Sequence, residues 1–426
     1  MTALARLVDR IAARAGQPFT VEYWDGTRQT YGAGPPAFAV RLNDRRTCLR
    51  LLANPSLRFG DAYADGAIEV RGDLGHLMEL LLRADPADVR PGLLRRSVAA
   101  LDSWLRRNSP HRSRRNAAYH YDLGNDFFRL WLGRTMAYSC AYFRAPSDDI
   151  DTAQEQKFRH VCEKLRLEPG QTLLDIGCGW GGLAAHAALH YGVRVLGITL
   201  SEAQRRGADE MLGARRLHDR VEIRCQDYRE LEEGRPFDRI VSIGMFEHVG
   251  RELIPRYLQE VARLLAPGGV GLLHTIGRVA PAPMDPWIAA RVFPGAYFPA
   301  LAEIVAPMGE RGLHPVDVES LRLHYASTLD RWREAFERAA PAVERMTDAR
   351  FVRMWRLYLA GAAAAFRVGN MTLWQIQFTK GPSDALPLTR DYLYRESTRD
   401  LLATAPPWDA EKSPSASSAP AAAHST

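Results

Sequence analysis

Residues 175–182 read Asp-Ile-Gly-Cys-Gly-Trp-Gly-Gly, and this stretch decides the fold. The apolar run 172–176 leads into it and predicts a short buried strand. Glycines after such a strand let the chain turn tightly into a helix and let a ligand approach the backbone closely. The stretch therefore predicts a ligand-binding turn between a strand and a helix.

Strand and helix patterns alternate on the carboxyl side of this turn. Further apolar runs predict buried strands, separated by helical stretches, at 193–199, 221–225, 239–243 and 270–276. Such alternation is typical of an α/β fold with a doubly wound, Rossmann-like parallel sheet. Residues 281–307 are rich in proline and aromatic residues and predict a lid or a wall for a substrate. Helices around 329–336 and 351–366 and a last strand at 371–379 complete the pattern.

Composition changes along the chain predict four regions. Residues 1–90 suggest a small N-terminal α+β accessory domain, and residues 116–400 hold the catalytic pattern. Between them, residues 91–115 form a basic amphipathic linker, which either packs between the domains or lies on an anionic membrane. Residues 401–426 are rich in Ser, Ala and Pro and predict a disordered tail.

Length and composition exclude several classes of protein. The chain has 426 residues, of which 46% are hydrophobic and 25% charged, so it is not disordered as a whole. Five cysteines are too few for a disulfide scaffold, and we expect reduced thiols in the cytoplasm. No apolar run approaches the roughly 18 residues of a membrane span. The net charge of +6 comes almost entirely from arginine, which favours an anionic partner or simply reflects genome composition.

The glycine-rich turn alone does not identify its ligand. A nicotinamide site requires an acidic residue at the end of the second strand, but residues 197–201 read Gly-Ile-Thr-Leu-Ser. Asp175 directly precedes the glycines, where a carboxylate suits a cationic ligand better than a pyrophosphate. We therefore favour S-adenosylmethionine (SAM), which carries a sulfonium and an amino group, over NAD.

Other candidate residues lie at the carboxyl ends of later strands. Glu247 follows the fourth strand, and His274 lies in the fifth, so both belong to the edge where doubly wound sheets bind ligands. Alternatively, Glu247 caps a helix and His274 is a core residue. The aromatic segments 119–128 and 138–143 predict either ordinary core or the wall of an apolar tunnel.

Three stretches together carry a specific resemblance. They are Tyr-Ser-Cys-Ala-Tyr at 138–142, the glycine-rich turn at 175–182, and Gly-Met-Phe-Glu-His-Val-Gly at 244–250. With them, the chain resembles the cyclopropane-fatty-acyl-phospholipid synthases, which have the mycolic acid cyclopropane synthases as relatives. The resemblance covers roughly residues 115–380. The N-terminal region also resembles the accessory domain of the phospholipid-acting bacterial members.

The resemblance implies a class I SAM-dependent methyltransferase domain and a specific reaction. The methyl group of SAM is added to the cis double bond of an unsaturated phospholipid acyl chain. A bound bicarbonate then takes a proton from the new methyl group, and the ring closes. By resemblance, the bicarbonate is held by Cys140, Glu247, His274, Tyr325 and the backbone of Ile276. We expect no metal ion.

The resemblance also implies the residues that bind the methyl donor. The expected SAM-binding residues are Tyr138, Ser139, Asp175, Gly177, Gly179, Thr199, Leu200, Gln204, Asp227 and Tyr228. Nearby rings, such as Tyr142, Phe246 or Tyr297, are candidates to stabilise the carbocation. One departure is Ala362, which stands where family members often have a cysteine.

The expected partner is unsaturated phospholipid, reached from the cytoplasm by peripheral contact with the inner membrane face. The N-terminal domain would dock the enzyme there or form a homodimer. Three alternatives remain. One is a sibling enzyme that makes a methyl branch, and another is a non-catalytic lipid-binding protein. The third, a nucleic-acid methyltransferase, is disfavoured by the apolar site, so we expect no nucleic acid.

Overall fold

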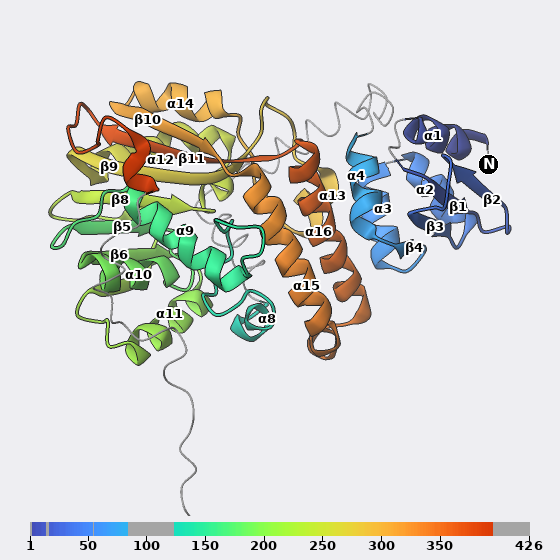
Figure 1. The fold of residues 1–426 in the computed structure, drawn as a ribbon, viewed down its shortest axis with the longest axis horizontal. Helices are drawn as coiled ribbons and strands as arrows, with labels where there is room; N and C mark the ends of the chain where they lie inside the picture. The colour runs from blue at the N-terminus through green and yellow to red at the C-terminus, as the bar shows by residue number, and fades with distance from the viewer. Residues whose placement is uncertain (1, 14–16, 54, 84–122, 395–426) are drawn as a thin grey trace, which may run out of the picture.

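The computed structural model describes residues 2–13, 17–53, 55–83 and 123–394 (Figure 1). The predicted linker at 91–115 and the predicted tail at 401–426 lie outside these residues, so the predicted domain boundaries stay predictions. The described part of the chain contains two sheets, one of seven strands and one of four.

The larger sheet has the strand order β10-β11-β9-β8-β5-β6-β7. Its strands are β5 (Thr172–Ile176), β6 (Arg194–Thr199), β7 (Val221–Cys225), β8 (Phe237–Ile243), β9 (Leu265–Gly277), β10 (Leu313–Ser320) and β11 (Thr372–Lys380). The five from β5 to β9 run parallel, while β11 pairs antiparallel with both β9 and β10. The predicted doubly wound sheet is confirmed. Its edge strand β10 was not predicted.

Helices cover both faces of this sheet. They are α9 (Ile150–Lys164), α10 (Gly182–Tyr191), α11 (Glu202–Ala214), α12 (Ile254–Leu264) and α14 (Leu301–Gly309). Two separate apolar clusters result, one packing α9 and α10 on the sheet and the other packing α12 and α14. Because both faces are covered, four of the five side chains of β5 are buried.

The N-terminal unit is a small α+β structure, as predicted. Its elements are α1 (Thr2–Ala12), β1 (Phe19–Glu22), β2 (Arg28–Tyr31), β3 (Phe38–Leu42), α2 (Arg45–Ala53), α3 (Pro55–Ala64), β4 (Ile68–Gly72) and α4 (Leu74–Arg83). The strand order is β2-β1-β3-β4, with β1 and β3 parallel and the other pairs antiparallel. Strands β2 and β4 were not predicted from the sequence.

Two long helices, α15 (Arg322–Met346) and α16 (Ala349–Val368), lie between the large sheet and the N-terminal unit (Figure 1). Helix α16 packs on α15 and also contacts α3 and α4. Shorter elements complete the structure: α8 (Asn125–Arg129), α13 (Pro286–Arg291), and the 3-10 helices η1 (Tyr228–Glu230), η2 (Phe246–His248), η3 (Arg251–Leu253) and η4 (Arg390–Leu393). The segment 281–307 thus contains α13 and part of α14.

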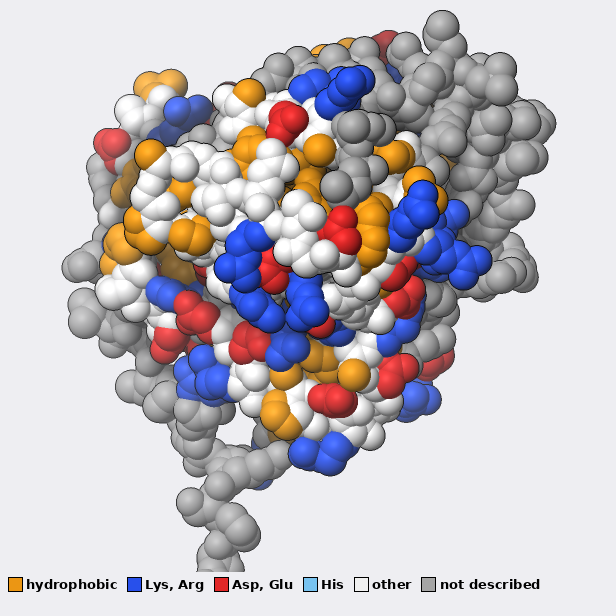
Figure 2. All heavy atoms as spheres, turned by 90° about the vertical axis from the view of Figure 1, so that its right-hand side faces the viewer, with side chains coloured by type: hydrophobic (Ala, Val, Ile, Leu, Met, Phe, Trp, Pro, Cys, Tyr) orange, Lys and Arg blue, Asp and Glu red, His pale blue; other side chains and the backbone are white. Residues whose placement is uncertain are grey.

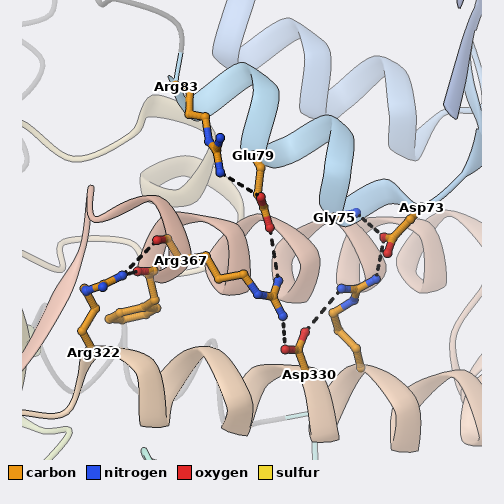
Figure 3. A network of polar contacts seen from close by, with 9 residues as sticks. Asp73, Gly75, Glu79, Arg83, Arg322, Asp330 and Arg367 are labelled. Atoms are coloured by element: carbon orange, nitrogen blue, oxygen red, sulfur yellow. Dashed lines mark hydrogen bonds and ion pairs between the residues drawn. The ribbon is translucent and has the colours of Figure 1, made fainter. Parts of the chain in front are cut away.

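Polar contacts join the N-terminal unit to the two long helices (Figure 3). Arg333 bridges Asp73 at 3.1 Å and Asp330 at 3.5 Å. Arg367 also reaches Asp330, and it lies 3.6 Å from Glu79 of α4. The carboxylate of Asp330 therefore serves two arginines at once, which fixes α15 and α16 against α4.

The N-terminal side of the molecule has a mixed surface. Figure 2 shows basic, acidic and hydrophobic side chains interspersed on that side, with basic side chains gathered near the middle of the view. On α2, Leu49 is 61% exposed, and the neighbouring Arg46 and Arg50 are exposed as well. Apolar and basic side chains therefore share this helix surface.

Candidate active site

The glycine-rich turn is tied to the neighbouring strand through its backbone. The N–H groups of Gly177 and Cys178 both donate to the carbonyl of Ile198 at the end of β6, at 2.9 and 3.0 Å. Gly177 has φ of +88°, and a Cβ placed there would lie 2.5 Å from Cβ of Met245. Glycine is required at this position by both the backbone conformation and the space.

A cavity opens beside this turn, at the carboxyl ends of β5, β6, β7 and β8. All ten residues expected to bind SAM line it: Tyr138, Ser139, Asp175, Gly177, Gly179, Thr199, Leu200, Gln204, Asp227 and Tyr228. They come from four separate stretches of sequence, which only the fold brings together. Their individual contacts with a ligand stay a prediction.

The floor of the cavity carries a buried pair of opposite charges. Burial raises the pKa of Asp175 to about 7, and the nearby Lys157 opposes that rise. Burial likewise lowers the pKa of Lys157 to about 8. The ammonium of Lys157 donates to Oγ of Ser139 at 3.0 Å. Sequence analysis did not single out Lys157, because a lone lysine within a helix gives no local signal of a site.

Hydrogen bonds hold the other walls of the cavity. The hydroxyl of Thr199 donates to Oε1 of Gln204 at 2.7 Å. The hydroxyls of Tyr138 and Tyr358 lie 2.9 Å apart and share a hydrogen bond. Asp227 accepts from the guanidinium of the neighbouring Arg229, with Nε at 2.8 Å. These contacts pre-orient the polar groups that line the cavity.

Glu247 contacts one of the other expected catalytic groups directly. Its Oε1 accepts the backbone N–H of Ile276 at 2.6 Å. Its Oε2 is buried and has no hydrogen-bond partner among the residues described. Burial raises the pKa of Glu247 to about 7. The Ile276 N–H, which was expected to donate to an anion, thus donates to the carboxylate instead.

His274 lies two residues before Ile276 on β9 and is 1% exposed. Its Nδ1 is 3.0 Å from Nε2 of Gln375, its register partner on β11. Its Nε2 is buried without a partner in the described part of the chain. Burial holds the pKa of His274 well below its usual range, so the ring is neutral at physiological pH.

Cys140 and Tyr325 meet at one carbonyl group. The carbonyl of Leu321 accepts the backbone N–H of Tyr325 at 3.0 Å, and Sγ of Cys140 lies 3.9 Å from it. Burial holds the pKa of the Cys140 thiol well above its usual range, so it stays protonated. The ring of Tyr325 packs on Phe366, with centroids 4.7 Å apart.

Backbone contacts connect these groups. The N–H of Leu321 donates to the carbonyl of Leu373 at 2.9 Å, and Leu373 is the register partner of Ile276. Glu247 and His274 thereby lie with Ile276 at the carboxyl end of β9, while Cys140 and Tyr325 both contact the backbone of Leu321, which is bonded to β11. None of the five lines the cavity itself, but Ser139 and His248, the neighbours of Cys140 and Glu247, do. The catalytic role of these five residues stays a prediction.

The three rings suggested for stabilising a cation have other contacts. Tyr142 is stacked between His160 and His324, with centroids 4.2 and 4.7 Å away. Phe246 packs on Tyr257, and the hydroxyl of Tyr297 donates to Glu303. The rings that lie with Tyr325 are instead Trp332 and Phe366, which sequence analysis missed. Ala362 packs against the apolar cluster that also contains Cys140, Tyr325, Trp332 and Phe366.

Comparisons with known proteins agree with this geometry. The family described as mycolic acid cyclopropane synthetase matches residues 108–376, and a family described as a domain of unknown function matches residues 7–88. A probable fatty acid methyltransferase of Pseudomonas putida is 39% identical over 89% of this chain and 96% of its own. The cyclopropane-fatty-acyl-phospholipid synthase of Escherichia coli is 38% identical over 82% and 90%.

A solved structure shows the same fold. The cyclopropane synthase MmaA2 from Mycobacterium tuberculosis superposes with a TM-score of 0.60 and 33% identity, covering 63% of this chain and 98% of its own. The related mycolic acid cyclopropane synthase CmaA1, complexed with SAH and CTAB, gives a TM-score of 0.61 at 34% identity, covering 64% of this chain and 99% of its own.

Proposed function

The chain belongs to the mycolic acid cyclopropane synthetase family, whose members are SAM-dependent methyltransferases, and from this membership we propose that it is a cyclopropane-fatty-acyl-phospholipid synthase. The proposed substrates are SAM and a cis-unsaturated acyl chain of a membrane phospholipid. The observation that carries the proposal is the buried group of Glu247, His274 and Ile276 beside the cavity at the sheet edge.

The cavity supplies what SAM requires. Asp175 offers a carboxylate for the positively charged methionine portion, while Asp227 and Tyr228 follow β7, where the adenine is expected to lie. Gly177 and Gly179 leave the backbone uncovered, so that the ligand can approach it closely. Because an alkene is a weak nucleophile, positioning of the methyl group against it supplies much of the rate.

The proposed reaction balances without an external oxidant or reductant. The methyl carbon leaves the sulfur of SAM and bonds to one alkene carbon, which leaves a cation on the other and produces neutral S-adenosylhomocysteine. Loss of a proton from the new methyl group then allows its carbon to bond to the cationic carbon, which closes the ring. Buried apolar walls keep water from trapping the cation. The rings of Tyr325, Trp332 and Phe366, which pack together, are the proposed groups that stabilise it.

The buried polar group fits a small anion that carries its own proton. Glu247 Oε2 and His274 Nε2 are both buried without partners in the described residues, and bicarbonate offers both a donor, its O–H, and acceptor oxygens. In the proposed chemistry, bicarbonate supplies the base for the lost proton. Glu247 accepts its O–H, while His274, Tyr325 and the Cys140 thiol donate to its oxygens. The Ile276 N–H donates to Glu247, so it can donate to bicarbonate only if this hydrogen bond breaks.

Contact with a membrane completes the proposal. No helix among the described residues is long and apolar enough to cross a membrane. Residues 279–284 read Val-Ala-Pro-Ala-Pro-Met and follow directly from the site at the end of β9. Val279 is 80% exposed. An exposed apolar loop suits contact with the surface of a bilayer. The N-terminal unit is proposed to assist this docking or to dimerise.

A second product is possible on the same scaffold, because the similar Pseudomonas putida protein is a probable fatty acid methyltransferase. The deciding experiment incubates the protein with SAM and vesicles of monounsaturated phospholipid, followed by mass spectrometry of the released fatty acids. A product heavier by one CH₂ and inert to bromine supports ring closure. A bromine-reactive product of the same mass supports a methyl-branched or methylene chain. No mass change contradicts both.

A further inference from the structure

The amide of Gln375 is buried next to the proposed base site and has no role in the reaction described so far. Its side chain is 0% exposed, and its Nε2 lies 3.0 Å from Nδ1 of His274. Gln375 and His274 are direct register partners of the antiparallel strands β11 and β9. Their side chains therefore leave the same face of the sheet side by side.

The hydrogen-bonding capacity of the amide favours Gln375 as the donor and Nδ1 of His274 as the acceptor. With its NH₂ toward the ring, Gln375 donates to Nδ1 and leaves its own Oε1 without a partner among the described residues. With the amide reversed, Oε1 would accept from Nδ1–H, and a buried NH₂ group would be left unpaired. An unpaired buried donor is rarer in folded proteins than an under-used carbonyl oxygen. The inference therefore rests on the orientation in which the Gln375 amide donates to Nδ1 of His274.

This orientation determines where the ring proton lies. A neutral imidazole carries one proton, and a nitrogen that accepts a hydrogen bond does not hold it. We propose that Gln375 is a positioning residue that holds the proton of His274 on Nε2 and so makes this buried nitrogen a hydrogen-bond donor for the bound anion. Without the amide, the ring is free to adopt the other tautomer, in which Nε2 would repel an anion with its lone pair.

The inference rests on the proposed function for the identity of the anion, but not for the tautomer. It is tested first on the full-length protein without substrates, by two-bond ¹H–¹⁵N correlation spectra of ¹⁵N-histidine-labelled protein. A His274→Gln variant identifies the His274 signals. The expected result is an Nε2–H tautomer in the wild type. A proton on Nδ1 would overturn the inference.

Two variants connect the tautomer to the reaction. In Gln375→Met the donor is lost at similar size, and we expect a mixed tautomer. The apparent affinity for bicarbonate in rate assays should fall roughly 10- to 100-fold, as for other residues that orient a ligand-binding histidine. The KM for SAM should stay unchanged. In Gln375→Glu the carboxylate accepts from Nδ1–H, and we expect the proton to move there with a similar loss.

Gln377 provides a matched control. It lies two residues further along β11, is 2% exposed, and donates to the carbonyl of Lys164 rather than to a site residue. Gln377→Met should leave the His274 tautomer and the bicarbonate dependence as in the wild type. If Gln375→Met also leaves both unchanged, the inference is wrong. If the tautomer shifts as expected while wild-type turnover ignores added bicarbonate, the role of Gln375 is supported and the proposed base is wrong.

Discussion

Oε1 of Glu247 accepts the backbone N–H of Ile276 at 2.6 Å, while Oε2 of the same carboxylate is buried without a partner among the described residues. Besides the Ile276 N–H, the Thr275 side chain also stabilises the ionised carboxyl group and opposes the effect of burial on its pKa. Burial raises its pKa to about 7 from an ordinary value near 4.5. The raised pKa makes the free energy of unfolding depend on pH.

A raised carboxyl pKa means that ionisation opposes folding. The penalty is absent below the unfolded pKa, grows as pH rises, and is complete above pH 7. We predict that at pH 8 Glu247→Gln unfolds at a higher urea concentration than the wild type, because its free energy of unfolding is larger by at most ~3 kcal/mol. At pH 5 the two free energies of unfolding should differ little. Its cyclopropanation activity should be lost. An equal difference in unfolding free energy at both pH values would contradict this account.

Alanine substitution of two glycines in the binding turn should have unequal effects on stability and SAM binding. Both Gly177 and Gly179 have positive φ, so alanine costs about 1–2 kcal/mol at either position. Only at Gly177 would the added Cβ collide with Met245, which adds a further ~1–3 kcal/mol. Thermal unfolding should therefore rank Gly177→Ala below Gly179→Ala. Calorimetric titration should show the weaker SAM binding for Gly177→Ala, and identical behaviour would be inconsistent with the packing.

The attachment of the N-terminal unit depends on Arg353. Its guanidinium donates to the carbonyls of Tyr63 and Ile68, at 2.6 and 2.7 Å, and lies 4.5 Å from the ring of Tyr63. We predict that Arg353→Met destabilises this contact by about 2–3 kcal/mol, because two backbone acceptors lose a charged donor. Limited proteolysis should then cut the N-terminal unit faster.

Arg350 is the control for this prediction. It pairs with Asp65 at 2.7 Å, but both side chains are about half exposed. Arg350→Met should cost less than ~1 kcal/mol, as is usual for exposed ion pairs. If the two variants were cleaved at the same rate, charge rather than the buried carbonyl contacts would hold the unit.

Membrane contact through the loop 279–284 gives a fourth prediction. Val279→Asp places a charge in the exposed apolar loop, and co-sedimentation with anionic phospholipid vesicles should fall severalfold. Val316→Asp is the control, since Val316 is 47% exposed on the edge strand β10, far from the end of β9. Equal loss in both variants would indicate a general charge effect and rule out this loop as the contact.

The strands that could be predicted are those with a recognisable hydrophobicity pattern in their own sequence. Apolar runs broken by glycine turns revealed β5 to β9, because buried parallel strands are continuous in hydrophobicity. Strand β10 was missed because it lies at the sheet edge, where exposed side chains alternate with partly buried ones. Strands β2 and β4 are equally short of buried side chains.

The candidate site likewise contains some residues that the sequence could reveal and others that it could not. Glu247 follows the recognisable strand β8 and His274 lies in the recognisable strand β9, so both could be identified. Lys157 and Gln375 gain their importance from partners far away in sequence, namely Ser139 and His274. No pattern within their own segments marks either residue. The aromatic contacts of Tyr325 likewise depend on how α15 packs against α16.

The carbonyl of Leu321 joins Cys140 to Tyr325, and its N–H joins both to β11. Leu321 makes these contacts through its peptide backbone, so every amino acid except proline preserves the donor at this position. A scan of single side-chain substitutions would therefore not detect the contribution of the Leu321 N–H. Replacing its amide by an ester through chemical synthesis would reveal it, because only that change removes the donor while the side chain stays in place.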